Sequence, residues 1–520
     1  MYKITFLITL LVICFSCSNE DDKEKKKETS VGKPAATDLT MQNNAISFIS
    51  NQDDVLAYGS IKLNQLLNKA YYDSDISKSE LVSSAVAKQA IEEIERIKSY
   101  IDVGIPIYYL IKGSDDINNL EFIAFGGIND SKAIIKEIKT NMPSLSIKEH
   151  KNFTLLQDRE IALAVSKDRF IVRGSSNRQA RNLSTKFKDY FNSFSGKADP
   201  TVKAIFDKSK DATIAYDYGK IMSLTEQLML TENIDMTGLN WMKDFDLTTS
   251  MDLAFEKGSI SISTNLYSEE MQKWNLMSSS SKKILTKLGP GKPSAGFLAN
   301  VNVDEIQKLW NVYYPDGIIN TLMEMNLGPE FENQIPEELA AIEATLMKDG
   351  LKSFFGGEIG IMLYGIPNEA SGQLLKMSAY MNIGSNIKDL IDENDIKNGI
   401  MIKDEFSIDF QDDHISVSSK NHAPDGKGPE LSSKFSNFGK APISAFIDLA
   451  QIPTNDLPRE LSDFESLIEM LDFIDMEFDM SGGHVTLHLK DKSKNALTQI
   501  ADIALEIGTL LLREMTGISL

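Results

Sequence analysis

The sequence predicts an α+β protein built from two similar halves, each an antiparallel β-meander sheet packed with helices. Two observations lead to this prediction: apolar and polar residues alternate in many short segments, and these segments recur in the same order about 240 residues later. The composition suits a folded body, because 42% of the 520 residues are hydrophobic and 25% are charged. A largely disordered or collagen-like chain is therefore excluded.

The first recurring segment is a strand followed by a helix. Alternate residues over 55–63 are apolar, as a half-buried strand requires, and residues 64–70 have helical character. At a shift of 240 residues the same alternation covers 295–303. A helical stretch of variable length follows in both places, so each half begins with the same two elements.

A β-hairpin is the segment that recurs most closely. Residues 161–172 alternate on both sides of a turn at 167–168, and a shift of 245 residues gives 406–417 around a turn at 412–413. Both arms and the turn keep this one shift without a gap. That behaviour is expected of the same hairpin present in two copies.

Three further strands recur in order, at shifts that drift as surface-loop insertions would make them drift. Five matched elements in one order indicate an internal duplication, whereas chance alternation is the alternative because any two strands share a period of two. The matched pairs are 122–128 with 377–383 at 255, 214–218 with 444–448 at about 230, and 251–262 with 476–487 at 225.

A Gly-Pro cluster at 289–293 separates the two copies, because neither a helix nor a strand accepts it. We therefore predict halves at 43–288 and 289–520. A final helix is expected over 493–515, with one apolar stripe that docks on the second sheet; membrane insertion or partner binding is the alternative. The stripe consists of Leu497, Ile500, Ala504, Ile507 and Leu511.

The first sixteen residues have the layout of a secretory signal. Lys3 supplies a positive start, and residues 4–16 form an uncharged, mostly apolar run. This run is shorter than the roughly 20 residues that a membrane-spanning helix needs. We therefore expect residues 1–16 to be a lipoprotein signal peptide.

Cys17 is the candidate lipidation site. Ser16 directly before it resembles the lipobox of bacterial lipoproteins, in which that cysteine is acylated and becomes the first residue, although Cys14 and Phe15 differ from the usual Leu and small residue. The chain has two cysteines, so processing at Cys17 excludes disulfides, cysteine nucleophiles and cysteine metal sites from the folded part. A conventional signal with idle or disulfide-bonded thiols is the alternative.

The segment after Cys17 predicts how the protein is held. Two or more acyl chains anchor a protein stably, so the lipid at Cys17 would bind the membrane. Residues 17–42 have almost no apolar run and predict a flexible tether. The acidic cluster at 18–22 resembles the export signal of surface lipoproteins in Bacteroidota. We expect attachment to the outer membrane, at the cell surface rather than on the periplasmic face.

The charge excludes nucleic acid as a partner. The chain carries 54 Lys and Arg against 75 Asp and Glu, a formal net charge of -21. Binding to phosphates depends on an excess of basic residues, which is missing here.

The histidines give no metal motif. His484 and His488 have the i,i+4 spacing of a zinc-binding helix, but Val-Thr-Leu between them and the Gly pair before them predict a strand. On a strand the two rings would stand about 13 Å apart, too far for one zinc ion. We interpret them as exposed strand residues and predict no metal site.

Catalytic motifs are also lacking. Ser294 lies in a near match to G-x-S-x-G that is one residue out of register and opens a strand. The glycine pairs at 126–127 and 356–357 predict bulges or tight strand ends, and no phosphate-binding or calcium-binding loop is present. The Asp pairs at 115–116 and 412–413 are interpreted as solvated turn residues and not as acid–base pairs. We therefore assign no catalytic residues and no cofactor.

The signal, Cys17, the acidic tether and the start at 53–58 followed by the Leu-rich stretch 63–67 resemble an uncharacterised Bacteroidota lipoprotein family, domain of unknown function 4836. The resemblance covers about 43–520 and rests on patterns of apolar positions. It implies an envelope location and this architecture, and it implies no reaction, cofactor or site residue.

Two hypotheses of function follow. The first is a non-enzymatic binding or scaffolding module on the outer membrane, with a protein, peptide or glycan ligand; a purely structural envelope protein is a variant of it. The second is a hydrolase acting on glycans or peptides with a carboxylate site in the cleft between the halves. Buried carboxylates of raised pKa would favour the hydrolase. A smooth apolar or aromatic groove would favour binding.

Overall fold

The structure is a computed structural model, and the chain folds as two compact units. The first consists of residues 1–224, 250–255 and 494–520, and the second of 225–249 and 256–493. The residues described are 36–71, 96, 98–113, 119–143, 145–158, 161–175, 182–231, 246–315, 317, 337–365, 376–387, 406–451 and 465–503. The predicted signal peptide, Cys17 and the first part of the predicted tether lie outside these residues.

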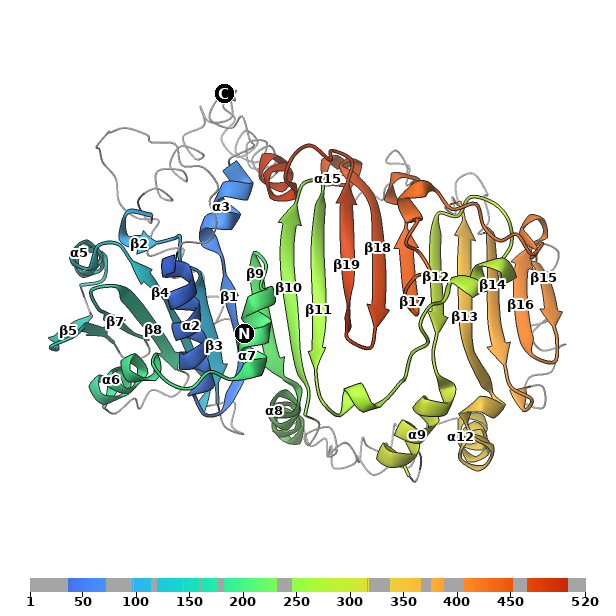
Figure 1. Cartoon of the computed structure of the whole chain (residues 1–520), viewed down its shortest axis with the longest axis horizontal. Helices are drawn as coiled ribbons and strands as arrows, with labels where there is room; N and C mark the ends of the chain where they lie inside the picture. Colours follow the sequence, from blue (N-terminus) through green and yellow to red (C-terminus); the bar gives the residue numbers. More distant parts are fainter. Residues whose placement is uncertain are drawn as a thin grey trace. The chain divides into compact units, whose positions relative to one another are not determined.

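The first unit is a sheet of antiparallel strands with helices (Figure 1). Its helices are α2 (Ala36–Ser50), α3 (Leu63–Tyr71), α5 (Ser131–Asn141), α6 (Leu183–Ser193), α7 (Pro200–Lys208) and the start of α8 (Tyr218–Thr231). Its strands are β1 (Val55–Ile61), β2 (Ile101–Asp102), β3 (Ile107–Lys112), β4 (Glu121–Ile128), β5 (Ser146–Glu149), β6 (Thr154–Gln157), β7 (Ile161–Val165), β8 (Arg169–Ser175), β9 (Ala212–Asp217) and most of β10 (Thr248–Glu256). The strands lie in the order β5-β6-β7-β8-β4-β3-β1-β9-β10, with β2 also on β4.

The second unit has the same class of architecture. Its strands are β11 (Ser259–Tyr267), β12 (Ala295–Asn300), β13 (Phe355–Tyr364), β14 (Lys376–Ile383), β15 (Phe406–Phe410), β16 (His414–Ser419), β17 (Ile443–Ile447), β18 (Leu471–Asp479) and β19 (Gly482–Leu489). They pair antiparallel in the order β11-β19-β18-β17-β12-β13-β14-β16-β15. Its helices are α9 (Val303–Tyr313), α12 (Glu337–Asp349) and α15 (Glu465–Glu469), and its short 3-10 turns include η6 (Lys282–Lys287), η9 (Lys420–His422) and η10 (Ser433–Phe435). The predicted α+β class with antiparallel sheets is confirmed.

The structure corrects two predictions about the ends of the chain: the extent of the tether and the place where the last helix docks. Helix α2 begins at Ala36, within the predicted tether, and buries Met41. The helix expected to dock on the second sheet starts instead against the first unit, where Asn495 Nδ2 donates to the Phe255 carbonyl at 2.9 Å and Thr498 donates to the Lys69 carbonyl. Residues 504–515 of that helix lie outside the described part. Within the described ranges, no helix is both long and apolar enough to cross a bilayer.

The core of the first unit is aromatic and lies between α2, α6, α7 and one face of the sheet. Phe48 of α2 contacts Phe125 of β4 and Phe194 after α6, with ring centroids 4.7 Å apart in both pairs. Phe206 of α7 packs on Tyr108 of β3 at 5.4 Å. The Asp199 side chain accepts hydrogen bonds from the N–H groups of Thr201 and Val202, and Pro200 is the first residue of α7. Asp before a helix and Pro at its first position are both typical of a helix N-terminus, so the sequence determines where α7 begins.

The core of the second unit lies on one face of its sheet, beneath η6 and η10. Gly360 is required at this contact, because an added Cβ would lie 2.7 Å from the Ile284 Cγ2 atom. The covered face also carries many serines, including the buried Ser378, Ser418 and Ser444. The apolar members of this core include Ile284, Leu288, Leu298, Met362, Phe435, Phe438 and Phe446.

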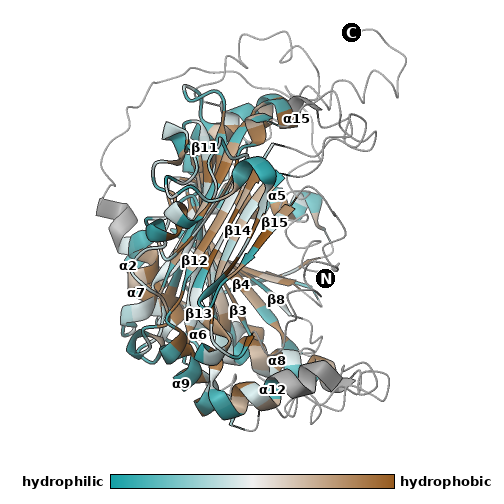
Figure 2. Ribbon diagram, turned by 90° about the vertical axis from the view of Figure 1, so that its right-hand side faces the viewer, coloured by the Kyte–Doolittle hydropathy of each residue, from teal (hydrophilic) through white to brown (hydrophobic). Residues whose placement is uncertain are grey.

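The opposite face of this sheet is apolar, and parts of it remain exposed. Figure 2 shows hydrophobic residues along β14 and β15. Phe297, Ile361 and Ile262 keep 38%, 37% and 42% of their surface exposed. An ordinary two-layer sheet leaves its polar face to water. Here the covered face holds both the apolar core and buried serines, and the opposite face keeps apolar residues exposed. One cross-strand row runs Ile408, Val417, Ala379, Ile361, Phe297, Ala445, Met476, Val485 and Ile262.

A buried ion-pair cluster ties β4 to β8 and α6 in the first unit. Glu121 accepts hydrogen bonds from Arg173 Nε at 2.8 Å and Nη2 at 3.2 Å, from Lys186 Nζ at 2.9 Å, and from the Tyr190 hydroxyl. Burial by itself would raise the pKa of Glu121, but the hydrogen bonds from Arg173, Lys186 and Tyr190 outweigh it and lower that pKa to about 2.

We expect Glu121→Gln to destabilise the first unit by about 3–5 kcal/mol near neutral pH, because it leaves the Arg173 guanidinium buried without its counter-ion. The ionised Glu121 stabilises the fold above its unfolded pKa of 4.5, and this contribution is lost as the pH falls toward about 2. Urea unfolding at neutral and acidic pH should therefore show the difference from wild type shrinking with acid.

The control for this experiment is Asp207→Asn. Asp207 forms an i,i+4 pair with Lys203 on α7, and about half of each side chain is exposed, so its loss should cost less than about 1 kcal/mol. A difference between Glu121→Gln and wild type that does not change with pH would contradict this account of the buried cluster.

Candidate functional site

A polar pocket of about 590 Å³ opens on the serine-bearing side of β14, β15 and β16 in the second unit. Buried residues of β14 and β16 form its floor, and more exposed residues of β15, of the β15–β16 turn and of the segment after η9 form its rim. Its lining residues are Lys287, Tyr380, Ser407, Ile408, Asp409, Asp413, His414, Ser416, Ser418, Ala423 and Pro424.

Strand register explains why these polar groups come together. Ser416 pairs with Tyr380 on one side and with Asp409 on the other, and Ser418 pairs with Ser407. Side chains directly opposite on neighbouring strands share a face and stand about 4.5–5.5 Å apart at Cβ. Alternation on three adjacent strands therefore collects their hydroxyls and carboxylates into one array.

Two serines on the pocket floor have hydroxyls that reach the pocket and make no hydrogen bond within the described part of the chain. Ser416 is 6% exposed and Ser418 is 3% exposed, yet neither hydroxyl makes a hydrogen bond to another residue of the described chain. By contrast, the neighbouring Ser378 hydroxyl accepts the Gly289 N–H at 2.8 Å. Among the described residues, neither hydroxyl is a fully buried polar atom without a partner, so water or a ligand in the pocket can reach both.

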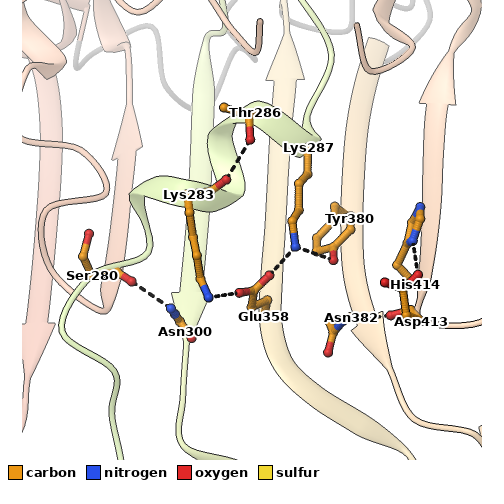
Figure 3. Close-up of polar contacts among 10 residues, drawn as sticks. All are labelled: Ser280, Lys283, Thr286, Lys287, Asn300, Glu358, Tyr380, Asn382, Asp413 and His414. Atoms are coloured by element: carbon orange, nitrogen blue, oxygen red, sulfur yellow. Dashed lines mark hydrogen bonds and ion pairs between the residues drawn. The ribbon is translucent and has the colours of Figure 1, made fainter. Parts of the chain in front are cut away.

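A cation–carboxylate network closes one side of the pocket (Figure 3). The buried Glu358 accepts from Lys283 Nζ at 2.5 Å and from Lys287 Nζ at 2.6 Å. Lys287 Nζ also donates to the Tyr380 hydroxyl at 2.7 Å and lies 4.5 Å from the centre of that ring. Burial would raise the pKa of Glu358, but the hydrogen bonds from the two lysines lower it, so the carboxylate stays ionised.

His414 stands at the other side, at the start of β16. Its Nδ1 lies 2.8 Å from Asp413 Oδ1, and its Nε2 lies 3.9 Å from Asp409 Oδ2. The hydrogen bond from His414 lowers the pKa of Asp413. The His414 ring also packs beside Tyr380, with centroids 5.4 Å apart, and Figure 3 shows the two side chains next to each other.

This arrangement suits binding better than nucleophilic catalysis. A serine nucleophile needs its hydroxyl within about 2.6–3.2 Å of a base, and in the described chain no serine hydroxyl is hydrogen-bonded to His414. The carboxylates with a resolved shift here, Glu358 and Asp413, have lowered pKa values and would serve poorly as acids. Across the described ranges, His, Cys, Asp and Glu side chains do not cluster in threes as a metal site would require.

The structure places the histidines considered from sequence on β19, as predicted. Both are only partly exposed and not fully exposed as expected, with 43% of the His484 side chain and 26% of the His488 side chain accessible. The His488 ring stacks on Phe473 with centroids 3.9 Å apart, and its Nε2 lies 2.7 Å from Asp475 Oδ1. His488 therefore contributes to packing on Phe473 and to a hydrogen-bond contact with Asp475 on β18.

Ser294 and the glycine pairs considered from the sequence lie in strands or directly next to them. Ser294 precedes β12, and its hydroxyl donates to the carbonyls of Leu363 and Gly365.

The pair 356–357 lies where the β13 register shifts, with Gly357 at φ +102°, so the bulge is confirmed. The pair 126–127 lies instead near the end of β4, in unbroken pairing with β8. The pair 115–116 and Cys17 lie outside the described residues.

Sequence reasoning missed the pocket. The pair 412–413 does form the hairpin turn, but Asp413 also lines the pocket and holds His414. The sequence signal that could have revealed the pocket is the alternation of residues along the strands. It places serine, aspartate and tyrosine side chains on one face of β14, β15 and β16. On sequence alone, that face resembles the solvent side of a sheet.

Comparisons with known proteins add no identity. No family model and no curated protein matches the chain. Solved structures entitled crystal forms III, IV and I of TP0453 have TM-scores of 0.27, 0.26 and 0.26, with 12%, 10% and 11% identity. Each match covers 42% of this chain and 78%, 79% and 77% of the respective structure. TM-scores at this level carry no argument about fold or function.

We expect Ser418→Ala to leave the stability of the ligand-free protein within about 0.5 kcal/mol, because the hydroxyl has no protein partner to lose. Ser378→Ala should cost about 1–3 kcal/mol, because it leaves the buried Gly289 N–H without an acceptor. Thermal and urea unfolding of the two variants measure this contrast at neighbouring positions of one sheet. Equal losses in both variants would mean that the Ser418 hydroxyl is structural.

Proposed function

We propose that this protein is a lipoprotein of the cell envelope, anchored to the outer membrane by lipid on Cys17, and that its body is a non-enzymatic binding module. The single observation that carries the binding role is the pocket floor, where the hydroxyls of Ser416 and Ser418 reach the pocket and make no hydrogen bond to any described residue. The anchor is supported by the signal layout of residues 1–16 and by Ser16 before Cys17. The acidic residues 18–22 support the cell surface over the periplasmic face.

The hydrolase alternative receives less support. It requires a carboxylate of raised pKa that a substrate can reach. Burial raises the pKa of Asp252 on β10, but this side chain is shielded from solvent and accepts the Thr213 hydroxyl at 2.5 Å. Its position suits a structural role in the first unit and not contact with a substrate.

We also infer that the strands arose by internal duplication. The pairing order β8-β4-β3-β1-β9-β10 has the same succession as β16-β14-β13-β12-β17-β18. Cross-strand partners also correspond: Leu163 pairs with Val172, and Ile408 pairs with Val417 at a uniform shift of 245. Such agreement in pairing goes beyond the period of two that any strands share.

The membership suggested by the resemblance to domain of unknown function 4836 is part of the same proposal. It is supported by the order of signal, Cys17, acidic spacer and first strand with its Leu-rich helix, β1 and α3. The predicted halves, 43–288 and 289–520, describe descent by duplication. The compact units follow contacts instead, and they place β11 with the second unit, where it pairs with β19.

A crystal structure tests the duplication. Superposing the strands of 43–288 on those of 289–520 should bring Leu163 onto Ile408 and Ile260 onto Val485. A best superposition that matched the strands in another order, or shifted these pairs by a residue, would overturn the duplication.

The anchor is tested in cells by labelling with an alkyne fatty acid. We expect the wild type to incorporate the label, Cys17→Ser to lose it, and Cys14→Ser to keep it, since bulky Ile13 precedes Cys14. Wild type should fractionate with the outer membrane and be cleaved when intact cells are treated with protease. Unlabelled wild-type protein would overturn the anchor, and full protection from protease would overturn the surface location.

A further inference from the structure

We propose that the pocket on β14, β15 and β16 binds a neutral saccharide. This inference rests on the proposed binding function and names the chemical class of its ligand. The geometry points to it through the mixture of groups on the lining: Ser416, Ser418 and Ser407 can each donate and accept, Asp409 accepts, and His414 can donate. A sugar hydroxyl also donates one hydrogen bond and accepts others, so a ring of hydroxyls complements such a lining.

The charges argue against an anion. Among the lining residues, two carboxylates, Asp409 and Asp413, stand against the ammonium of Lys287. That ammonium is already held by Glu358 at 2.6 Å and by the Tyr380 hydroxyl at 2.7 Å. A phosphate, sulfate or carboxylate ligand would therefore meet net negative charge.

The carboxylates are also engaged, which argues against a cation. Asp413 lies 2.8 Å from His414 Nδ1, and Asp409 accepts from Gln411 Nε2 at 2.5 Å while lying 3.9 Å from His414 Nε2. An ammonium ligand would have to compete with these partners. A neutral ligand uses their remaining acceptor positions without displacing them.

Size and rim fit the same class. The volume of about 590 Å³ falls within the roughly 300–1,000 Å³ of ligand pockets, but the floor is more polar than such pockets usually are. Ala423 and Pro424 on the rim offer apolar surface to the C–H groups of a sugar ring. A ligand with both many hydroxyls and C–H faces therefore matches the pocket.

The corresponding place in the first unit is filled mostly with apolar side chains, while the counterpart of Ser418 is the buried, ion-paired Arg173. The shift of 245 residues relates Ser416 to Ile171 and Asp409 to Ala164, and the shift of 255 relates Tyr380 to Phe125. Ile171, Ala164 and Phe125 are all fully buried. The positions of Ser416, Asp409 and Tyr380 thus hold packed apolar side chains in the first unit and line a cavity in the second.

The test is a titration of the full chain in a detergent without a sugar headgroup. The probes are maltose, lactose and N,N′-diacetylchitobiose, followed by saturation-transfer NMR and by the shift in melting temperature. We expect at least one disaccharide to bind, and the double variant S416A/S418A to weaken it by at least about tenfold through the loss of two hydrogen bonds. Ser444→Ala is the matched control, because Ser444 is buried on β17 outside the pocket and should leave binding unchanged.

Two further probes separate the possible failures. If a lysine-rich peptide or inorganic phosphate binds in a manner sensitive to S416A/S418A and no sugar does, the ligand class is overturned while the binding function stands. If no probe binds, or if sugar binding is unchanged in the double variant, the saccharide site is overturned. The lipid labelling of Cys17 is independent of these results, so the anchor is judged separately.

Discussion

The segment around η6 packs against a face of the second unit's sheet that carries both apolar and polar side chains, so each polar group there needs a partner. Glu358 holds two lysines, Ser378 accepts the Gly289 N–H, and the Asn300 amide donates to the Ser280 carbonyl. The apolar side chains of η6 and its end, Ile284 and Leu288, pack on this same face. Covering this mixed face therefore determines both where the core lies and where a cavity lined by hydroxyls can form.

The first unit also has buried polar groups that need partners, and it pairs them in an ion-pair cluster. It buries a carboxylate on β4, Glu121, and surrounds it with Arg173, Lys186 and Tyr190. A buried ion pair gains little net stability over an apolar contact, but losing one partner is costly. The cluster therefore specifies how β4, β8 and α6 meet, while aromatic contacts such as that of Phe48 with Phe125 supply apolar burial.

Alternation in the sequence was sufficient to predict the strands of the matched pairs, including the 161–172 and 406–417 hairpins, and the α+β class, because a strand has a period of two wherever one face differs from the other. It did not predict β3, β5, β6 or β13. It could not predict which face is covered, since Ser416 and Ser418 on a strand look like solvent-facing residues until η6 and η9 are placed. His414 was missed for the same reason. The position of the last helix also escaped prediction, because the hydrogen bonds of Asn495 and Thr498 join residues more than 200 positions apart.

The cavity has an energetic consequence. A hydroxyl on a dry pocket floor would cost about 1–3 kcal/mol, a large part of the roughly 5–15 kcal/mol that separates a folded domain from its unfolded chain. The packed counterpart around Phe125 and Ile171 shows that a sheet position of this kind can be filled with apolar side chains instead. Selection for stability alone would favour the filled version over a pocket that water must occupy. A ligand that hydrogen-bonds to Ser416 and Ser418 would stabilise the folded state by an amount that grows with the logarithm of its concentration, so the proposed binding role would account for a cavity that stability does not require.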